Sequence, residues 1–319
     1  MLCFFGSGIA LLLIAGLIIM HQEMKSIDPV SVLRDDMPKD VAGIICMRPG
    51  PLLSSPIIKD LSALVRDRNV IPSTQRDLIA ELRRLTMIDL EHDVDWICGG
   101  FTESKMAYLL VHGQFNDLGK DALEQQVDGY TVYTRHNISI VVLDHKLIGF
   151  APDIGWINRL IQTANGSAPS VADNHSLSSM LDSIDVAHTL WGVYIPPSTL
   201  IGDQNVLIKS FLKSVAQMQS VIFNLDCLDS LRLSVQCISP DAPSTSKIFA
   251  GANQLLGLAR LFSTRDHELQ DILNAITIRQ DENRVMIQAE LHRDVILAAA
   301  RKNSQYIGTY LGRFMPLTK

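Results

Sequence analysis

The sequence predicts an α+β protein in which an N-terminal transmembrane helix is followed by two similar antiparallel-sheet domains, each with helices packed on one face. Three observations lead to this prediction. Residues 2–20 form a charge-free apolar run, strand-like segments come in adjacent pairs, and the order of elements recurs in the second half. Hairpins expected at 94–113, 219–238 and 275–291 break the strand–helix alternation of a parallel fold, so the sheets should be antiparallel.

The first element is the apolar run LCFFGSGIALLLIAGLIIM at residues 2–20. As a helix it would be about 28 Å long, close to the ~30 Å hydrocarbon core of a bilayer. The alternative is a cleaved secretory signal. Against it, the run is long for such a signal, and no small-residue cleavage site follows Met20. We therefore predict an uncleaved, single-pass membrane anchor.

The orientation of the anchor depends on its flanking charges. Lys25, Arg34 and Lys39 follow the run and no Lys or Arg precedes it, which by the positive-inside rule would place the soluble region in the cytoplasm. Acidic residues lie among these bases, however, and almost no N-terminal flank exists to compare with them. We expect an extracytoplasmic (periplasmic) soluble region, with the cytoplasmic orientation as the alternative.

Small residues in the anchor form a candidate helix-packing site. Gly6 and Ala10 have the small-xxx-small spacing, and Gly8 and Ala15 share a face seven residues apart. Such faces allow a second helix to approach closely. We predict that this face contacts other membrane-protein subunits. The alternative is that Gly and Ala are simply common in membrane helices.

The remaining chain is divided into a polar tether at 21–37, a first domain at 38–185 and a second domain at 186–319. In the first domain the patterns predict, in order, a strand at 40–47, a helix from Ser55 and Pro56 to about 66, a helix at 73–85, strands at 94–101 and 106–113, a helix near 117–126, strands at 130–135, 138–144 and 146–150, a helix after Pro152, and a short helix at 177–184.

The second domain repeats this order. Residues 41–56 and 188–203 each give a strand with an inner glycine, a proline break and a helix start. A strand–turn–strand–helix unit follows in each half, and a strand pair with a closing helix ends it. The recurrence predicts an internal duplication.

The start at 38–61, the phrase IDLEHDVD at 88–95 and the ending VHGQF at 111–115 resemble a group of uncharacterised bacterial membrane-anchored proteins with two similar halves. The resemblance covers much of residues 38–200. It implies the two-domain α+β fold but no activity and no site residue. Members usually begin with a basic N-terminal region, which this sequence lacks.

Composition and motifs exclude several classes of function. A formal charge of −6 and a pI near 5.8 argue against a nucleic-acid-binding surface, which needs a basic patch. The sequence has no phosphate-binding G-x-x-x-x-G-K-[ST] loop and no G-x-G-x-x-G motif. It also has no G-x-S-x-G motif, so it offers no nucleophile elbow. We predict no cofactor and no catalytic residue.

The densest polar segment comprises Glu91, His92, Asp93 and Asp95, with His112 on the expected partner strand. These residues would be metal ligands or acid–base groups if they converged. The favoured interpretation is that the carboxylates cap a turn at the start of a strand, so we predict no metal site.

Five cysteines are widely separated: Cys3, Cys46, Cys98, Cys227 and Cys237. Three of them lie in apolar strand-like runs, where cysteine usually acts as a small buried hydrophobe. We expect free buried thiols, and a disulfide between two of them is the alternative.

These observations favour a membrane-tethered, non-catalytic interaction or scaffold protein, as an accessory subunit of a membrane complex. The alternative is an enzyme or ligand-binding receptor with its site in the cleft between the two halves.

Overall fold

The structure is a computed structural model that describes residues 28–67, 88–102, 106–115, 118, 122–135, 138–151, 154–196, 218–264 and 266–302. Its strands are β1 (Gly43–Met47), β2 (Val94–Phe101), β3 (Met106–Gly113), β4 (Leu123–Val127), β5 (Tyr130–Arg135), β6 (Ile138–Asp144), β7 (Leu147–Ala151), β8 (Leu190–Tyr194), β9 (Ser220–Cys227), β10 (Ser230–Ile238), β11 (Ile276–Asp281) and β12 (Arg284–His292). Its helices are α2 (Pro29–Asp36), α3 (Pro49–Ser54), α4 (Pro56–Asp67), α6 (Ile154–Ala164), the 3₁₀ helix η1 (Val171–Asp173), α7 (His175–Ser183), α9 (Ala242–Phe262), α10 (His267–Asn274) and a final helix at 293–302.

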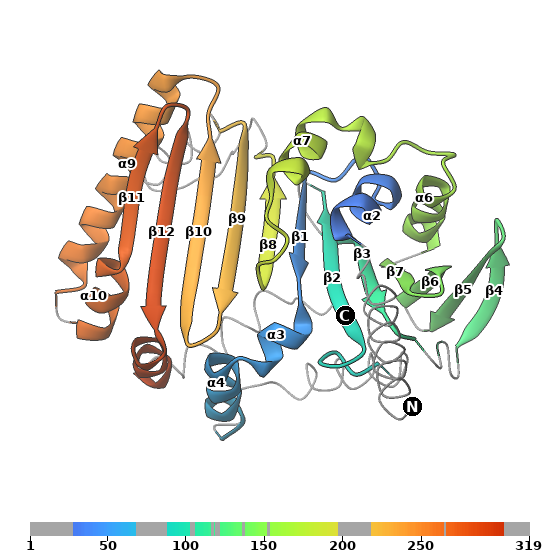
Figure 1. Cartoon of the computed structure of the whole chain (residues 1–319), viewed down its shortest axis with the longest axis horizontal. Coiled ribbons are helices and arrows are strands. Elements are labelled where there is room, and N and C mark those ends of the chain that lie inside the picture. Colours follow the sequence, from blue (N-terminus) through green and yellow to red (C-terminus); the bar gives the residue numbers. More distant parts are fainter. Residues whose placement is uncertain are drawn as a thin grey trace, which may run out of the picture.

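The described strands form one antiparallel sheet of 12 strands in the order β11-β12-β10-β9-β8-β1-β2-β3-β7-β6-β5-β4 (Figure 1). The prediction of an α+β protein built on antiparallel strands is therefore confirmed. The expectation of separate sheets in the two halves is wrong, because β1 pairs with β8 along its whole length and joins them.

The two halves of this sheet have the same strand order outward from the β1–β8 pair. One half runs β1-β2-β3-β7-β6 and the other runs β8-β9-β10-β12-β11. Strands β4 and β5, which follow β3 in the sequence, extend the first half only. In the second half the long helix α9 follows the equivalent strand, β10, in the sequence.

Helices cover opposite faces of the sheet in the two halves. Ile44 on β1 belongs to the main apolar core together with Leu33 of α2, Ile157 of α6 and Leu181 of α7, and Figure 1 shows these three helices in front of the sheet. The strand register can be followed from β1 through β8 and β9 to β10. By this register the Cys237 side chain lies on the same face of the sheet as Gly43, and this face is opposite to that of Ile44.

Cys237 is buried against Ile248 of α9, so α9 packs on the back of the sheet. The prediction that helices pack on one face does not describe the whole sheet, and in the first half the face opposite to the main core is also apolar and buried, at residues such as Ile97, Val111 and Ile148. No described helix lies in front of strands β9–β12 (Figure 1), and the residues of β10 and β12 on that face, such as Arg232, Gln236 and Glu290, are mostly polar.

The helix expected near 117–126 is wrong, because residues 123–127 form strand β4. The backbone reverses at Asp128 and Gly129, which have φ values of 48° and 85°. An Asp-Gly pair between two runs is the strongest short-range signal for a two-residue hairpin. That signal outweighed the weak helical spacing of the residues before it.

Part of the segment expected to be a tether is a packed helix. Asp28 caps α2 by accepting a hydrogen bond from the N–H of Val30 at 3.1 Å, and Pro29 occupies the first helical position. Leu33 and Met37 are fully buried. Proline therefore starts a helix here, and the polar look of the segment reflects its solvent-facing side.

Several predicted helices agree with the structure. Helix α4 begins at Pro56 directly after Ser55, α6 follows residue 152, and α7 lies within 175–183. The break expected at Pro49 is instead the short helix α3. The helix predicted at 73–85 lies outside the described residues.

The predicted anchor at 2–20, with its packing residues Gly6, Gly8, Ala10 and Ala15, also lies outside the described residues. None of the helices in the described part of the chain is both long enough and apolar enough to cross a bilayer.

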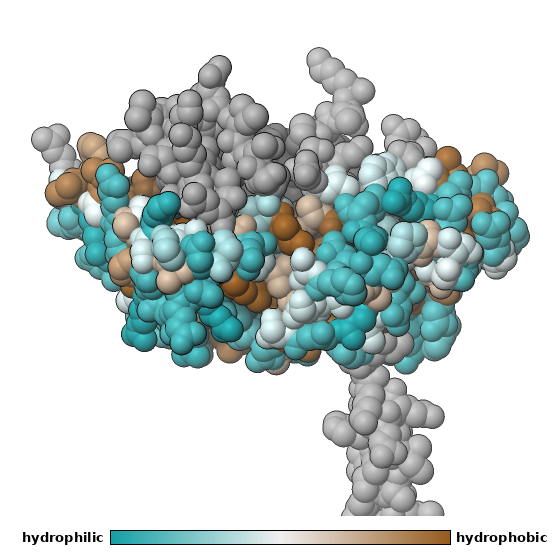
Figure 2. Space-filling model, turned by 90° about the horizontal axis from the view of Figure 1, so that it is seen from above, coloured by the Kyte–Doolittle hydropathy of each residue, from teal (hydrophilic) through white to brown (hydrophobic). Residues whose placement is uncertain are grey.

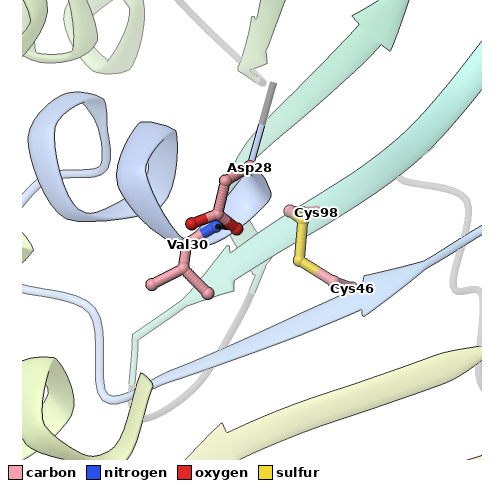
Figure 3. The surroundings of a disulfide bond; sticks show 4 residues. All are labelled: Asp28, Val30, Cys46 and Cys98. Carbon is pink, nitrogen blue, oxygen red and sulfur yellow. Dashed lines mark hydrogen bonds between the residues drawn. A yellow bond between two sulfur atoms is a disulfide. The ribbon is translucent and has the colours of Figure 1, made fainter. Parts of the chain in front are cut away.

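The expectation of free thiols at Cys46 and Cys98 is wrong, because the two residues form a disulfide (Figure 3). They are directly opposite each other on β1 and β2, with a Cα–Cα distance of 4.0 Å. Sequence spacing hid this pairing, since 52 residues separate them. Cys227 and Cys237 are free and buried, as expected.

Candidate functional site

The polar segment at 91–95 forms a turn in front of β2. Asp93 accepts a hydrogen bond from the N–H of Asp89 at 2.8 Å, and Asp89 accepts one from the N–H of Glu91 at 3.0 Å. The interpretation of the carboxylates as turn caps is confirmed for Asp93 and Asp89. His92 is exposed and its Nδ1 lies 3.1 Å from Asp89, so it belongs to the same turn.

His112 does not join that turn. Its ring is 2% exposed, and it stacks on Trp96 with a centroid distance of 5.3 Å. Nδ1 of His112 lies 2.9 Å from a carboxylate oxygen of Asp95. The two groups are not aligned for a hydrogen bond, and neither ring nitrogen of His112 has a hydrogen-bond partner. His92 and His112 thus contact different carboxylates.

Another histidine–carboxylate pair, at the start of β8, was not predicted from the sequence. Nδ1 of His188 lies 2.7 Å from Asp226 Oδ2, and the N–H of Thr189 donates to Asp226 Oδ1 at 3.0 Å. Burial acts to raise the pKa of Asp226, but the Thr189 and His188 hydrogen bonds outweigh it and hold the pKa below its usual range. An ionised Asp226 fixes the orientation of the His188 ring.

The sequence offered no signal for this pair, because 38 residues separate its members and neither lies in a motif. In the described part of the chain, no three His, Cys, Asp or Glu side chains gather as metal ligands. The geometry of His188 and Asp226 can hold a proton or orient a polar ligand.

On the front of β10 and β12, several polar side chains are hydrogen-bonded to one another. Glu290 accepts hydrogen bonds from Arg232 at 2.9 Å and from Ser230 at 3.1 Å. Both charged side chains are more than half exposed, so the pair contributes little to stability. Viewed from above, the described surface is mostly hydrophilic, with small hydrophobic groups that include the two ends of the elongated molecule (Figure 2).

A hollow of about 490 Å³ lies between α4 and the helix at 293–302. Its lining is of mixed charge, and Arg293 closes one side by donating to Asp60 at 2.7 Å. The two opposite charges satisfy each other, so the hollow presents no unpaired charge from this pair for a ligand.

The most exposed large apolar residue in the described part of the chain lies at the end of α9. Phe262 is 86% exposed and its neighbour Leu261 is 69% exposed, and Leu269 on the adjoining α10 is 43% exposed. We call these three residues the α9 tip. Burying a phenylalanine or leucine side chain contributes about 1.5–3 kcal/mol of favourable free energy. Burial of the α9 tip against another apolar surface would therefore be favourable.

The α9 tip is held rigidly. The guanidinium of Arg260 donates to the carbonyl oxygens of Leu273 at 2.9 Å and Ile276 at 3.2 Å, which ties the last turn of α9 to the end of α10 and the start of β11. The sequence does not indicate the α9 tip, because it does not distinguish the exposed apolar residues of α9 from the buried ones.

Comparisons with known proteins give little further information. No protein-family model matches the sequence, and no curated protein matches it. Among solved structures, crystal form I of TP0453 is 8% identical, covers 87% of this chain and 98% of its own, and has a TM-score of 0.41. Crystal form IV of TP0453 is 9% identical, covers 86% and 97%, and has a TM-score of 0.44. At these TM-scores the likeness assigns neither a fold family nor a function to this chain.

Proposed function

We propose that this chain is a membrane-tethered, non-catalytic interaction protein that serves as an accessory subunit of a larger membrane assembly. The observation that carries the proposal is the exposure of Leu261 and Phe262 side by side. Adjacent exposed apolar side chains on a folded surface mark interaction sites. Aromatic residues at such sites often supply much of the binding energy.

The rigidity of the α9 tip supports a docking role. The Arg260 hydrogen bonds fix the backbone that carries Leu261 and Phe262. A surface ordered before binding loses less conformational entropy when a partner covers it. The partner surface is therefore an apolar groove or pocket on another protein subunit.

The disulfide supports an extracytoplasmic location for the soluble region. Disulfides persist in oxidising compartments such as the periplasm and are rare in the cytosol. The Cys46–Cys98 bond is buried in the central strands of the sheet. A cytoplasmic soluble region, the alternative orientation, would leave these two cysteines reduced.

The anchor is the second contact in this proposal. The apolar run at 2–20 tethers the chain, and its small-residue face of Gly6, Gly8, Ala10 and Ala15 packs against a helix of another subunit. The common strand order of the two halves supports the internal duplication, in which 38–185 and 186–319 descend from one α+β unit.

The proposal is tested by co-purification from native membranes after detergent extraction. Leu261→Gln with Phe262→Gln should lose the subunits that accompany the wild-type chain. Leu228→Gln is the matched control, because Leu228 is 58% exposed but lies on the β9–β10 turn. Gly8→Leu with Ala15→Leu tests the anchor contact separately. Retention of every subunit by both double variants would refute the proposal.

The second candidate is an enzyme or ligand-binding receptor with its site between the halves. The observation that favours it is the His188–Asp226 pair, which lies beside β8 where the halves meet. Asp226 lies on the same side of β9 as Ile222, which belongs to the main core on the front face, so such a site would lie on the front of the sheet. Asp226→Asn should leave co-purification unchanged if docking is the function. Loss of cellular function in a folded Asp226→Asn variant would favour the receptor or enzyme.

A further inference from the structure

Strand β4 is one edge of the sheet that the described strands form. It pairs with β5 and, among the described residues, with no strand on its other side. Natural sheets protect such edges with charged side chains, especially Lys, or with Pro, a bulge or a covering element, and the only charged side chain on β4 is that of Glu124. The sequence LEQQV has no Lys or Pro, and its pairing with β5 has no bulge. The opposite edge, β11, packs against α9 and α10.

The hairpin geometry determines which backbone groups point outward. In a two-residue turn such as Asp128-Gly129, the flanking residues Val127 and Tyr130 form a hydrogen-bonded pair. Alternation along β4 then directs the backbone groups of Leu123 and Gln125 toward β5. The N–H and C=O groups of Glu124 and Gln126 point away from the sheet.

We propose that β4 pairs with β4 of a second copy of this chain, antiparallel and about a two-fold axis, so that one sheet runs through two protomers. Charge selects the register. With Gln125 opposite the partner's Gln125, Glu124 lies opposite the partner's Gln126. If the register shifted by one residue pair, Glu124 would lie opposite the partner's Glu124 in one direction and opposite the partner's Asp128 in the other. Both registers place two negative charges opposite each other, which is unfavourable.

The same register covers the exposed apolar residue of the edge. Leu123, which is 69% exposed, lies opposite the partner's Val127, and the two-fold axis makes this contact twice. Glu124 and Gln126 supply the backbone hydrogen bonds. The contact area is small, so the dimer is weak in dilute solution. Attachment of both copies to one membrane raises their effective concentration and favours it.

The experiment is disulfide cross-linking of the full-length chain in native membranes under mild oxidation. Gln125→Cys should give a dimer on a non-reducing gel, because directly opposite residues in a non-hydrogen-bonded pair have Cα atoms about 4.5 Å apart. Leu123→Cys is the matched control. Its symmetry mates lie roughly 13 Å apart along the strands, so it should form no dimer alone but should cross-link when mixed with Val127→Cys.

A second variant tests the backbone pairing. Gln126→Pro removes an outward N–H while leaving the β4–β5 hydrogen bonds in place, so it should lower Gln125→Cys cross-linking by about tenfold. Gln126→Ala should have little effect. The proposal is overturned if Leu123→Cys alone cross-links as well as Gln125→Cys, if Gln125→Cys gives no dimer, or if the proline variant cross-links normally. Loss of the co-purifying subunits in the α9 variant would not affect these results, because the α9 tip and β4 lie at opposite ends of the sheet.

Discussion

The Cys46–Cys98 disulfide should make a large contribution to stability. It closes a loop with a sequence separation of 52 residues. In the chain-entropy treatment, a loop of this size restricts the unfolded chain by about 4 kcal/mol at 25 °C. With a urea dependence of ~3 kcal/mol/M, the unfolding midpoint should fall by about 1.3 M when the bond is reduced.

The assay is urea unfolding of the detergent-solubilised chain before and after reduction, followed by tryptophan fluorescence. Cys46→Ala with Cys98→Ala should match the reduced protein and should no longer respond to reductant. Alkylation of acid-quenched protein provides a chemical control, because Cys46 and Cys98 should react only after reduction. Coincident midpoints for oxidised and reduced protein, or alkylation of both cysteines without reduction, would refute the reasoning.

Three further predictions concern α2, its charge and the anchor. Leu33→Ala should destabilise the protein by about 2–5 kcal/mol in urea unfolding, because Leu33 is fully buried; a change below 0.5 kcal/mol would mean that α2 does not pack. Burial, then the charges of Asp35 and Asp144, raise the pKa of Asp36 from 3.8 to about 6. The folded state therefore holds this proton more tightly than the unfolded chain, and the stability from Asp36 is complete below pH 4 and lost as the pH rises through 6. Asp36→Asn should be more stable than wild type at pH 7, by ~1 kcal/mol after allowance for solvent screening, and equal stability of the two at pH 7 would contradict this. Deletion of residues 1–20 should release a folded fragment from membranes, and retention of that fragment after a carbonate wash would contradict the anchor.

The strands were predictable where alternation and turn residues agree. The hairpins of β2 with β3 and of β9 with β10 follow from paired apolar runs around short polar turns. Strand β4 was missed although its Asp128-Gly129 turn was visible. Helix α2 lies in the segment whose polar composition predicts a tether, whereas Pro29 at the first helical position favours a helix start.

The pairings between distant residues could not be predicted. Cys46 meets Cys98 only because β1 and β2 adopt one particular register, and local patterns do not determine that register. The contact of His188 with Asp226 depends on the same kind of alignment between β8 and β9. The α9 tip was hidden for a different reason, since exposure depends on which elements surround a helix.

The size of the native assembly tests the central claim most directly. The wild-type chain, extracted from its own membranes in mild detergent, should elute in gel filtration as a stable complex far larger than the 35.3 kDa chain. Leu261→Gln with Phe262→Gln should elute much later, and Leu228→Gln should elute with wild type. Elution of wild type and the α9 double variant at the same size would contradict the account.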